Sequence, residues 1–177
     1  MKMLKKAAAV LLAAAMSLVM LTACGGGSGS GSTGLVRDTA KEDQLISWAQ
    51  EYAQANNSDL KLEKSEGVSN AAAAGLADAK LFLNIQTKQA TGDANAAYAS
   101  MMKACQASLS SQNKSGAVMP LMCAEKDFTK ENVVKAFDAL MPEVEAKFQA
   151  NKIEPKTVGA AVTVQNGNVY MVVIVAN

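Results

Sequence analysis

The stretch VGAAVTVQNGNVYMVVIV, residues 158–175, decides the fold. It contains two apolar runs, Val158 to Val164 and Val169 to Val175, separated by a short polar segment that includes Asn166-Gly167. A type I′ turn requires positive φ at both central residues, and Asn-Gly is the pair that adopts this conformation most readily. The pattern therefore predicts a β-hairpin at the end of the chain.

The second strand of this hairpin is apolar on both faces. Residues 170–175 read Tyr-Met-Val-Val-Ile-Val, with no polar residue at alternate positions. A strand of this kind is typical of the centre of a sheet whose two faces are both covered. We therefore expect an α+β fold, in which a small antiparallel sheet ending in the C-terminal hairpin is sandwiched by helices.

The residues before the hairpin supply the covering helices. Apolar residues recur at helical spacing in three segments, and the alternating stretch Leu60 to Lys64 reads as an extended linker between the first two. The predicted helices run from Asp38 to about Asn57, from Ser65 or Glu66 to Asn84, and from Ala94 to Ser110.

A short strand and two more helices are expected between the third helix and the hairpin. Ala117 to Cys123 is apolar, and Pro120 within it cannot donate a ladder hydrogen bond, so this strand should lie at a sheet edge. Thr129 marks a helix start, and we expect that helix to break at Pro142, where a further short helix begins and ends near Asn151.

The N-terminus carries the pattern of an export signal. A basic start, Met1 to Lys6, is followed by an apolar run to Met20 that is shorter than the ~20 residues needed to span a bilayer. The next residues, Leu21-Thr22-Ala23-Cys24, resemble the lipobox of bacterial lipoproteins. The resemblance implies cleavage after Ala23, lipidation of Cys24 and a location on the extracytoplasmic face of the cell membrane.

This interpretation divides the chain into a signal peptide (1–23), a lipidated Cys24 with a Gly/Ser tether (24–34) and one α+β domain (35–177). Two acyl chains anchor a protein stably, so the membrane is the first expected partner. The tether is a random coil reaching less than about 20 Å, which keeps the domain near the membrane surface. We also expect the protein to have a partner in the cell envelope or outside the cell, which the sequence does not identify.

Charge and composition narrow the function classes. If the signal peptide is removed with Lys2, Lys5 and Lys6, the remaining chain has fourteen basic and sixteen acidic residues. A chain with this slight negative charge lacks the excess of positive charge that is typical of nucleic-acid-binding proteins. Histidine is absent, which excludes Ser-His-Asp and Cys-His catalysis and removes the commonest zinc ligand. We assign no catalytic residue, metal or cofactor.

Two cysteines remain in the expected domain. Outside the cytoplasm disulfides persist, so Cys105 and Cys123 are candidates for a bridge between the third helix and the edge strand. The alternative is that both are buried, reduced thiols that pack as small apolar side chains.

The order of elements resembles the CAP (SCP-like) superfamily. Three segments carry the resemblance: Ala55 to Ala79, the helix from Thr129 to Met141, and Thr157 to Tyr170 with its hairpin. The resemblance implies an α-β-α sandwich. The usual cleft of that family holds two histidines and two acidic residues, and this chain has no histidine, so no family site residue is carried over.

We therefore expect a membrane-anchored, non-catalytic binding or interaction module of the cell envelope, with a CAP-like scaffold. One alternative is a carboxylate-dependent hydrolase of cell-wall glycan or peptide, and a second is a copper-handling lipoprotein. Trp48 and Tyr52 could form a stacking platform for sugar, although their spacing also suits the core. The candidate carboxylates are Glu63, Glu66, Glu131, Glu143 and Glu145, and the candidate soft ligands are Met101, Met102, Met119, Met122 and Cys123.

Overall fold

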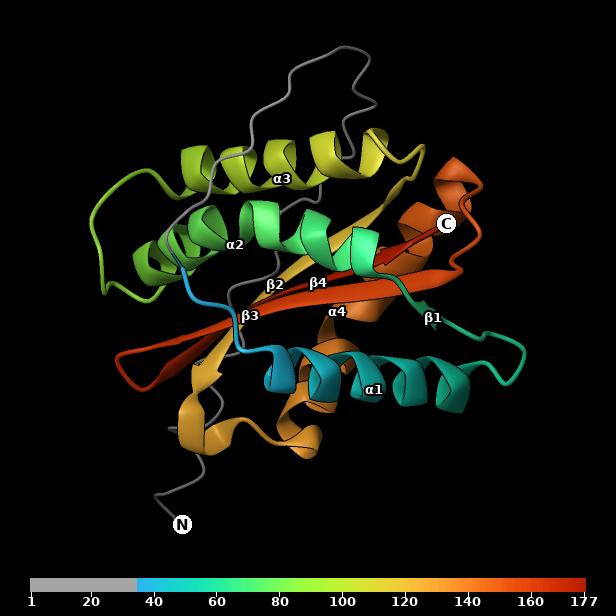
Figure 1. Ribbon diagram of the computed structural model, residues 1–177, viewed down its shortest axis with the longest axis horizontal. Coiled ribbons are helices and arrows are strands. Elements are labelled where there is room, and N and C mark those ends of the chain that lie inside the picture. Colours follow the sequence, from blue (N-terminus) through green and yellow to red (C-terminus); the bar gives the residue numbers. More distant parts are fainter. Residues whose placement is uncertain (1–34) are drawn as a thin grey trace.

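A computed structural model describes residues 35–177 of the chain (Figure 1). Within this range the strands form one mixed sheet in the order β1-β3-β4-β2, and helices pack on both of its faces. The elements in chain order are α1 (Thr39–Asn56), β1 (Glu63–Lys64), α2 (Glu66–Gln86), α3 (Ala94–Ser110), β2 (Gly116–Ala124), a 3-10 turn (Glu125–Asp127), α4 (Lys130–Asn151), β3 (Thr157–Gln165) and β4 (Asn168–Ala176).

The C-terminal hairpin forms as the sequence predicts. Asn166 and Gly167 have φ angles of 52° and 73°, which are the positive values that a type I′ turn requires. They join β3 to β4, and the pair Gln165 and Asn168 closes the turn. β4 lies between β3 and β2, so it is a central strand, and its residues from Val169 onward are buried.

The sheet separates two helical layers, and the predicted α+β sandwich is confirmed. In Figure 1, α2 and α3 cover one face, and α1 and α4 cover the other. The residues of β4 alternate between the layers: Val173 and Val175 pack with α1 and α4, whereas Val172 and Ile174 pack with α2 and α3. This alternation explains why the strand is apolar at every position.

The sheet edges differ. Long strands β2, β3 and β4 are antiparallel, whereas the two-residue β1 pairs with β3 in parallel, which adds a parallel pair that the sequence does not indicate. β2 is an edge strand, as the position of Pro120 predicts.

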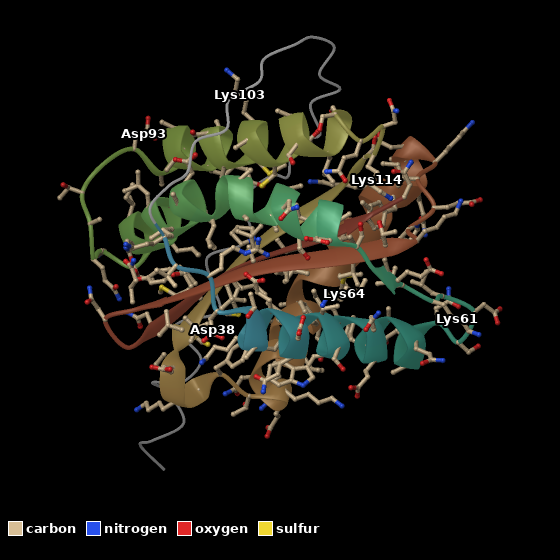
Figure 2. The ribbon with its side chains drawn as sticks, in the orientation of Figure 1. Asp38, Lys61, Lys64, Asp93, Lys103 and Lys114 are labelled. Atoms are coloured by element: carbon tan, nitrogen blue, oxygen red, sulfur yellow. The ribbon has the colours of Figure 1, made fainter. Side chains whose placement is uncertain are left out.

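Each α-helix within residues 35–177 begins with a capping side chain. Asp38, Ser65, Asp93 and Thr129 accept hydrogen bonds from backbone N–H groups in the first turns of α1, α2, α3 and α4. A cap of this kind typically stabilises by about 1 kcal/mol, because those N–H groups have no partner within the helix. Figure 2 shows Asp38 and Asp93 at the starts of α1 and α3.

The expected break at Pro142 is wrong, because α4 continues through it as a single helix. Proline removes one backbone hydrogen bond and crowds the preceding turn. Leu140, Val144 and Phe148 on either side of it are all buried on one face of the helix. Their burial continues across the proline and offsets the lost bond, with each fully buried side chain contributing about 1.5–3 kcal/mol.

Candidate functional site

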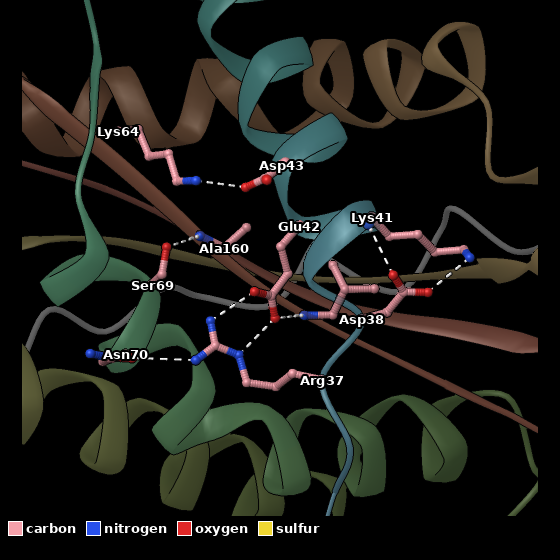
Figure 3. A network of polar contacts seen from close by, with 10 residues as sticks. Arg37, Asp38, Lys41, Glu42, Asp43, Lys64, Ser69, Asn70 and Ala160 are labelled. Atoms are coloured by element: carbon pink, nitrogen blue, oxygen red, sulfur yellow. Dashed lines mark hydrogen bonds and ion pairs between the residues drawn. The ribbon is translucent and has the colours of Figure 1, made fainter.

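A partly buried polar network lies where the start of α1 meets the outer edge of β3 (Figure 3). β1 pairs with β3 only at Thr157 and Val158, so the rest of this edge has no strand beside it. The backbone groups of Ala160 and Val162 point toward this side and require other partners. Side chains from α1 and α2 and a backbone N–H from the segment before α1 supply those partners.

Glu42 is the central residue of the network. It is only 4% exposed, and its Oε1 accepts hydrogen bonds from the backbone N–H of Val162 at 3.0 Å and from Arg37 Nε at 2.8 Å. Its Oε2 accepts from Arg37 Nη2, also at 2.8 Å. This pairing raises the pKa of Arg37. All these bonds are charge-assisted, so both oxygens of Glu42 are engaged in holding the structure together.

Further contacts close the same edge. The Ser69 hydroxyl accepts from the backbone N–H of Ala160 at 3.2 Å, and the N–H of Asp38 donates to the carbonyl of Val162 at 2.8 Å. The Thr163 hydroxyl donates to the carbonyl of Val36 at 2.8 Å. We call these five residues together the β3 edge clasp: Val36, Arg37, Asp38, Glu42 and Ser69. The clasp leaves no open ladder for another strand to join at this part of the edge.

A glycine on β3 allows α2 to reach the clasp. A Cβ placed on Gly159 would lie 2.3 Å from the backbone nitrogen of Ser69 and 2.5 Å from the carbonyl carbon of Val68. Only glycine permits so close an approach between helix and strand. Gly159 thereby brings the Ser69 hydroxyl within reach of the sheet edge.

Sequence reasoning missed the clasp. The only local signals are the opposite charges of Arg37 and Glu42 on either side of the capping Asp38. Their role depends on Val162, which is 120 residues from Glu42 in the chain. No spacing rule relates positions so far apart.

Cys105 and Cys123 are not joined by the disulfide that the sequence leaves possible. Cys105 and Cys123 are free thiols, and they belong to clusters on opposite faces of the sheet. Cys105 packs against α2, where a Cβ on Gly75 would meet its Sγ at 2.3 Å. Burial raises the pKa of Cys105 to about 12 and that of Cys123 to about 11, so both thiols stay protonated at neutral pH and react poorly. Cys105 is buried in the core, whereas Cys123 is half-buried.

The soft-ligand set is likewise divided by the sheet. Met119 and Cys123 pack in the layer of α1 and α4, whereas Met101 and Met102 pack in the layer of α2 and α3. Met122 lies in a small cluster with Phe82 and Tyr170. Within residues 35–177, no group of three or more His, Cys, Asp or Glu side chains is placed to hold a metal ion. Met101, Met102, Met119 and Met122 are buried in the core.

The candidate carboxylates are exposed and are spread over three elements. Glu63 is on β1 and Glu66 is in the first turn of α2, whereas the other three are on α4. Glu131 binds Lys135 at 2.6 Å, which lowers the pKa of its carboxyl. Glu143 and Glu145 are two positions apart on a helix and so point in different directions. The structure does not gather these residues into an acid/base pair.

Aromatic side chains gather where α1 meets α4 and Phe128, the residue that follows the 3-10 turn. The Trp48 and Phe128 rings have centroids 5.1 Å apart, and the Tyr52 and Phe137 rings have centroids 5.5 Å apart, both in tilted arrangements. Phe137 is buried, whereas the other three rings are half-buried and pack against the core. We call these four residues the aromatic seam. Trp48 and Tyr52 therefore contribute to the core and also reach the surface.

Carboxylates border the aromatic seam. The Tyr52 hydroxyl hydrogen bonds to Asp138, and burial together with Asp138 raises the pKa of Tyr52 to about 12. Glu51 follows on the next turn of α1 from Trp48, where it pairs with Lys130 and accepts from the Ser47 hydroxyl at 3.3 Å. Partly exposed aromatic faces beside hydrogen-bonding groups are typical of surfaces that recognise ligands with both apolar and polar parts.

Cys24 and Ala23, the predicted lipidation and cleavage residues, lie outside the described residues. Between residues 35 and 177, no helix is long and apolar enough to cross a membrane.

Comparisons of the chain with known protein families, curated proteins and solved structures found no match.

Proposed function

We propose that this protein is a lipoprotein held at the extracytoplasmic face of the cell membrane by a lipid on Cys24. In this proposal its domain, residues 35–177, is a non-catalytic binding module of the cell envelope. The order of basic, apolar and small residues up to Cys24 supports the anchor. The aromatic seam supports the binding role.

The seam is the observation that carries the proposal. Trp48, Tyr52 and Phe128 come from two separate segments, and each is only half-buried. The carboxylates of Asp138 and Glu51 supply hydrogen-bond acceptors beside them. A sugar offers an apolar C–H face to an aromatic ring and hydroxyl donors at its rim. We therefore propose a cell-wall glycan as the ligand.

The arrangement of one sheet between two helical layers supports a CAP-like scaffold. A sheet that ends in a hairpin and has helices on both faces is the arrangement which the resemblance of residues 55–79, 129–141 and 157–170 implies. We propose a diverged CAP-like domain whose binding surface is the aromatic seam. The proposal assigns it no hydrolytic step.

The fluorescence of Trp48 tests the binding role directly, because it is the only tryptophan in the chain. Adding soluble cell-wall glycan fragments to the detergent-solubilised protein should change its emission in a saturable way. Trp48→Ala should abolish the heat of binding in calorimetry. Tyr52→Phe keeps the ring, removes the bond to Asp138 and should weaken binding less.

Leu81→Ala is the matched control. Leu81 is an exposed apolar residue, 45% accessible, on α2 in the opposite layer, so its loss should leave glycan binding unchanged. If glycan fragments leave the emission of Trp48 unchanged at every concentration, the glycan-binding role is wrong. The lipid anchor is tested separately by substitution of Cys24.

A further inference from the structure

We infer that Asn166 is a site of spontaneous deamidation, a covalent change that requires only water as co-reactant. The dipeptide Asn-Gly occurs once in the chain, at Asn166-Gly167, and both residues are exposed at the tip of the β3–β4 hairpin. A Cβ on Gly167 would meet no atom within 4 Å, so solvent reaches this backbone freely.

The reaction starts with attack of the Gly167 backbone nitrogen on Cγ of the Asn166 side chain. The new N–Cγ bond closes a five-membered succinimide ring, and the bond from Cγ to the amide nitrogen breaks. Ammonia leaves, carrying the proton that Gly167 loses. Water then opens the ring at either carbonyl carbon and gives aspartate or isoaspartate. Glycine favours the attack because it has no side chain to shield its nitrogen.

The contacts of Asn166 leave its amide available. Within residues 35–177, neither its side chain nor the N–H of Gly167 forms a hydrogen bond, and the tip is held by the Gly167 carbonyl, which accepts from the N–H of Glu125 at 2.8 Å. Four other asparagines differ in this respect. The amide nitrogens of Asn56, Asn132 and Asn151 donate to backbone carbonyls, and Asn84 accepts from Tyr170 at 2.7 Å.

Deamidation changes the turn that joins β3 to β4. Isoaspartate adds one methylene to the backbone of a two-residue turn, and that turn sets the pairing of Gln165 with Asn168. Aspartate keeps the backbone length and adds only a negative charge. Loss of stability should therefore follow the isoaspartate fraction.

The test is to incubate the purified full-length protein at mildly alkaline pH and map its peptides by mass spectrometry. We expect the peptide containing Asn166 to gain one dalton before any other asparagine peptide, with isoaspartate as a later-eluting form. The melting temperature should fall as isoaspartate accumulates.

Asn166→Gly is the control, because Gly-Gly also favours a type I′ turn and carries no amide to lose. This variant should keep its melting temperature through the same incubation. Equal or faster conversion of another asparagine in the folded wild type would overturn the inference, and so would an equal loss of stability in Asn166→Gly.

Discussion

The carboxylate of Glu42 on α1 accepts a hydrogen bond from the backbone N–H of Val162 on β3 at 3.0 Å. The same carboxylate pairs with Arg37, which lies before the helix. One side chain thus joins the first helix, the segment before it and the next-to-last strand. Because β1 covers only two residues of β3, this contact replaces a missing strand at the sheet edge.

Removing this carboxylate should destabilise the fold strongly. We expect Glu42→Ala to lower the free energy of unfolding by about 3 kcal/mol, because it leaves the Val162 N–H and the Arg37 guanidinium without their acceptor. Urea denaturation measures the loss. Glu131→Ala, which removes a fully exposed pair with Lys135, should unfold close to wild type. Equal midpoints for the two variants would contradict a structural role for Glu42.

Adding one methyl group at Gly159 should also destabilise the protein. The Cβ of Gly159→Ala would overlap the backbone of Val68 and Ser69, which cannot move as a side chain can. We expect a loss of about 1–3 kcal/mol by overpacking. Gly67→Ala is the comparison, since the atom it meets is the end of the flexible Gln112 side chain. Thermal unfolding of both variants checks the order, with Gly159→Ala the less stable.

Stability should fall as the pH rises above about 9. Burial raises the pKa of Cys105 from 9.0 to about 12 and that of Tyr52 from 10.0 to about 12. Both groups are neutral when protonated, so the folded state retains protons that the unfolded state loses, and its stability declines between pH 9 and 12. Cys105→Ala should reduce the decline that begins near pH 9 and leave the parts due to Cys123, whose pKa burial raises to about 11, and to Tyr52. Urea midpoints across this range measure it, and an unchanged slope in the variant would refute the assignment.

The anchor gives a separate prediction. Cys24→Ala should leave the chain uncleaved after Ala23 or release it in soluble form, because the proposed lipid requires the thiol of Cys24. Partition between detergent and aqueous phases, with the mass of the mature N-terminus, measures this. Cys123→Ala is the control and should remain in the detergent phase. Wild-type protein that partitions into the aqueous phase would rule out the lipid.

Much of the fold can be predicted from local patterns. The hairpin follows from Asn166-Gly167 between β-branched runs, and the edge position of β2 follows from Pro120. The bounds of α3 match the helical spacing of its apolar residues. In each case the physical signal is contained within a few neighbouring residues.

The rest depends on contacts between distant segments. The packing of α3 places Cys105 on one face of the sheet, and the register of β2 points Cys123 to the other face. The short loop between α3 and β2 therefore does not bring the two thiols together. Pro142 remains within α4 because burial on the helix face outweighs a local break signal. The partners of Glu42 and Ser69 on β3 are visible only once the sheet is assembled.

The clasp also determines where mechanical tension from the N-terminal side would enter the domain. Within four residues of Leu35 the chain is fastened to β3 by the Val36 carbonyl, the Arg37 guanidinium acting through Glu42, and the Asp38 N–H. A pull on an anchored chain would therefore load the edge of the sheet before it reached the first helix. Detachment of this short segment from β3 would be the first yielding step, and it would precede any separation of β3 from β4.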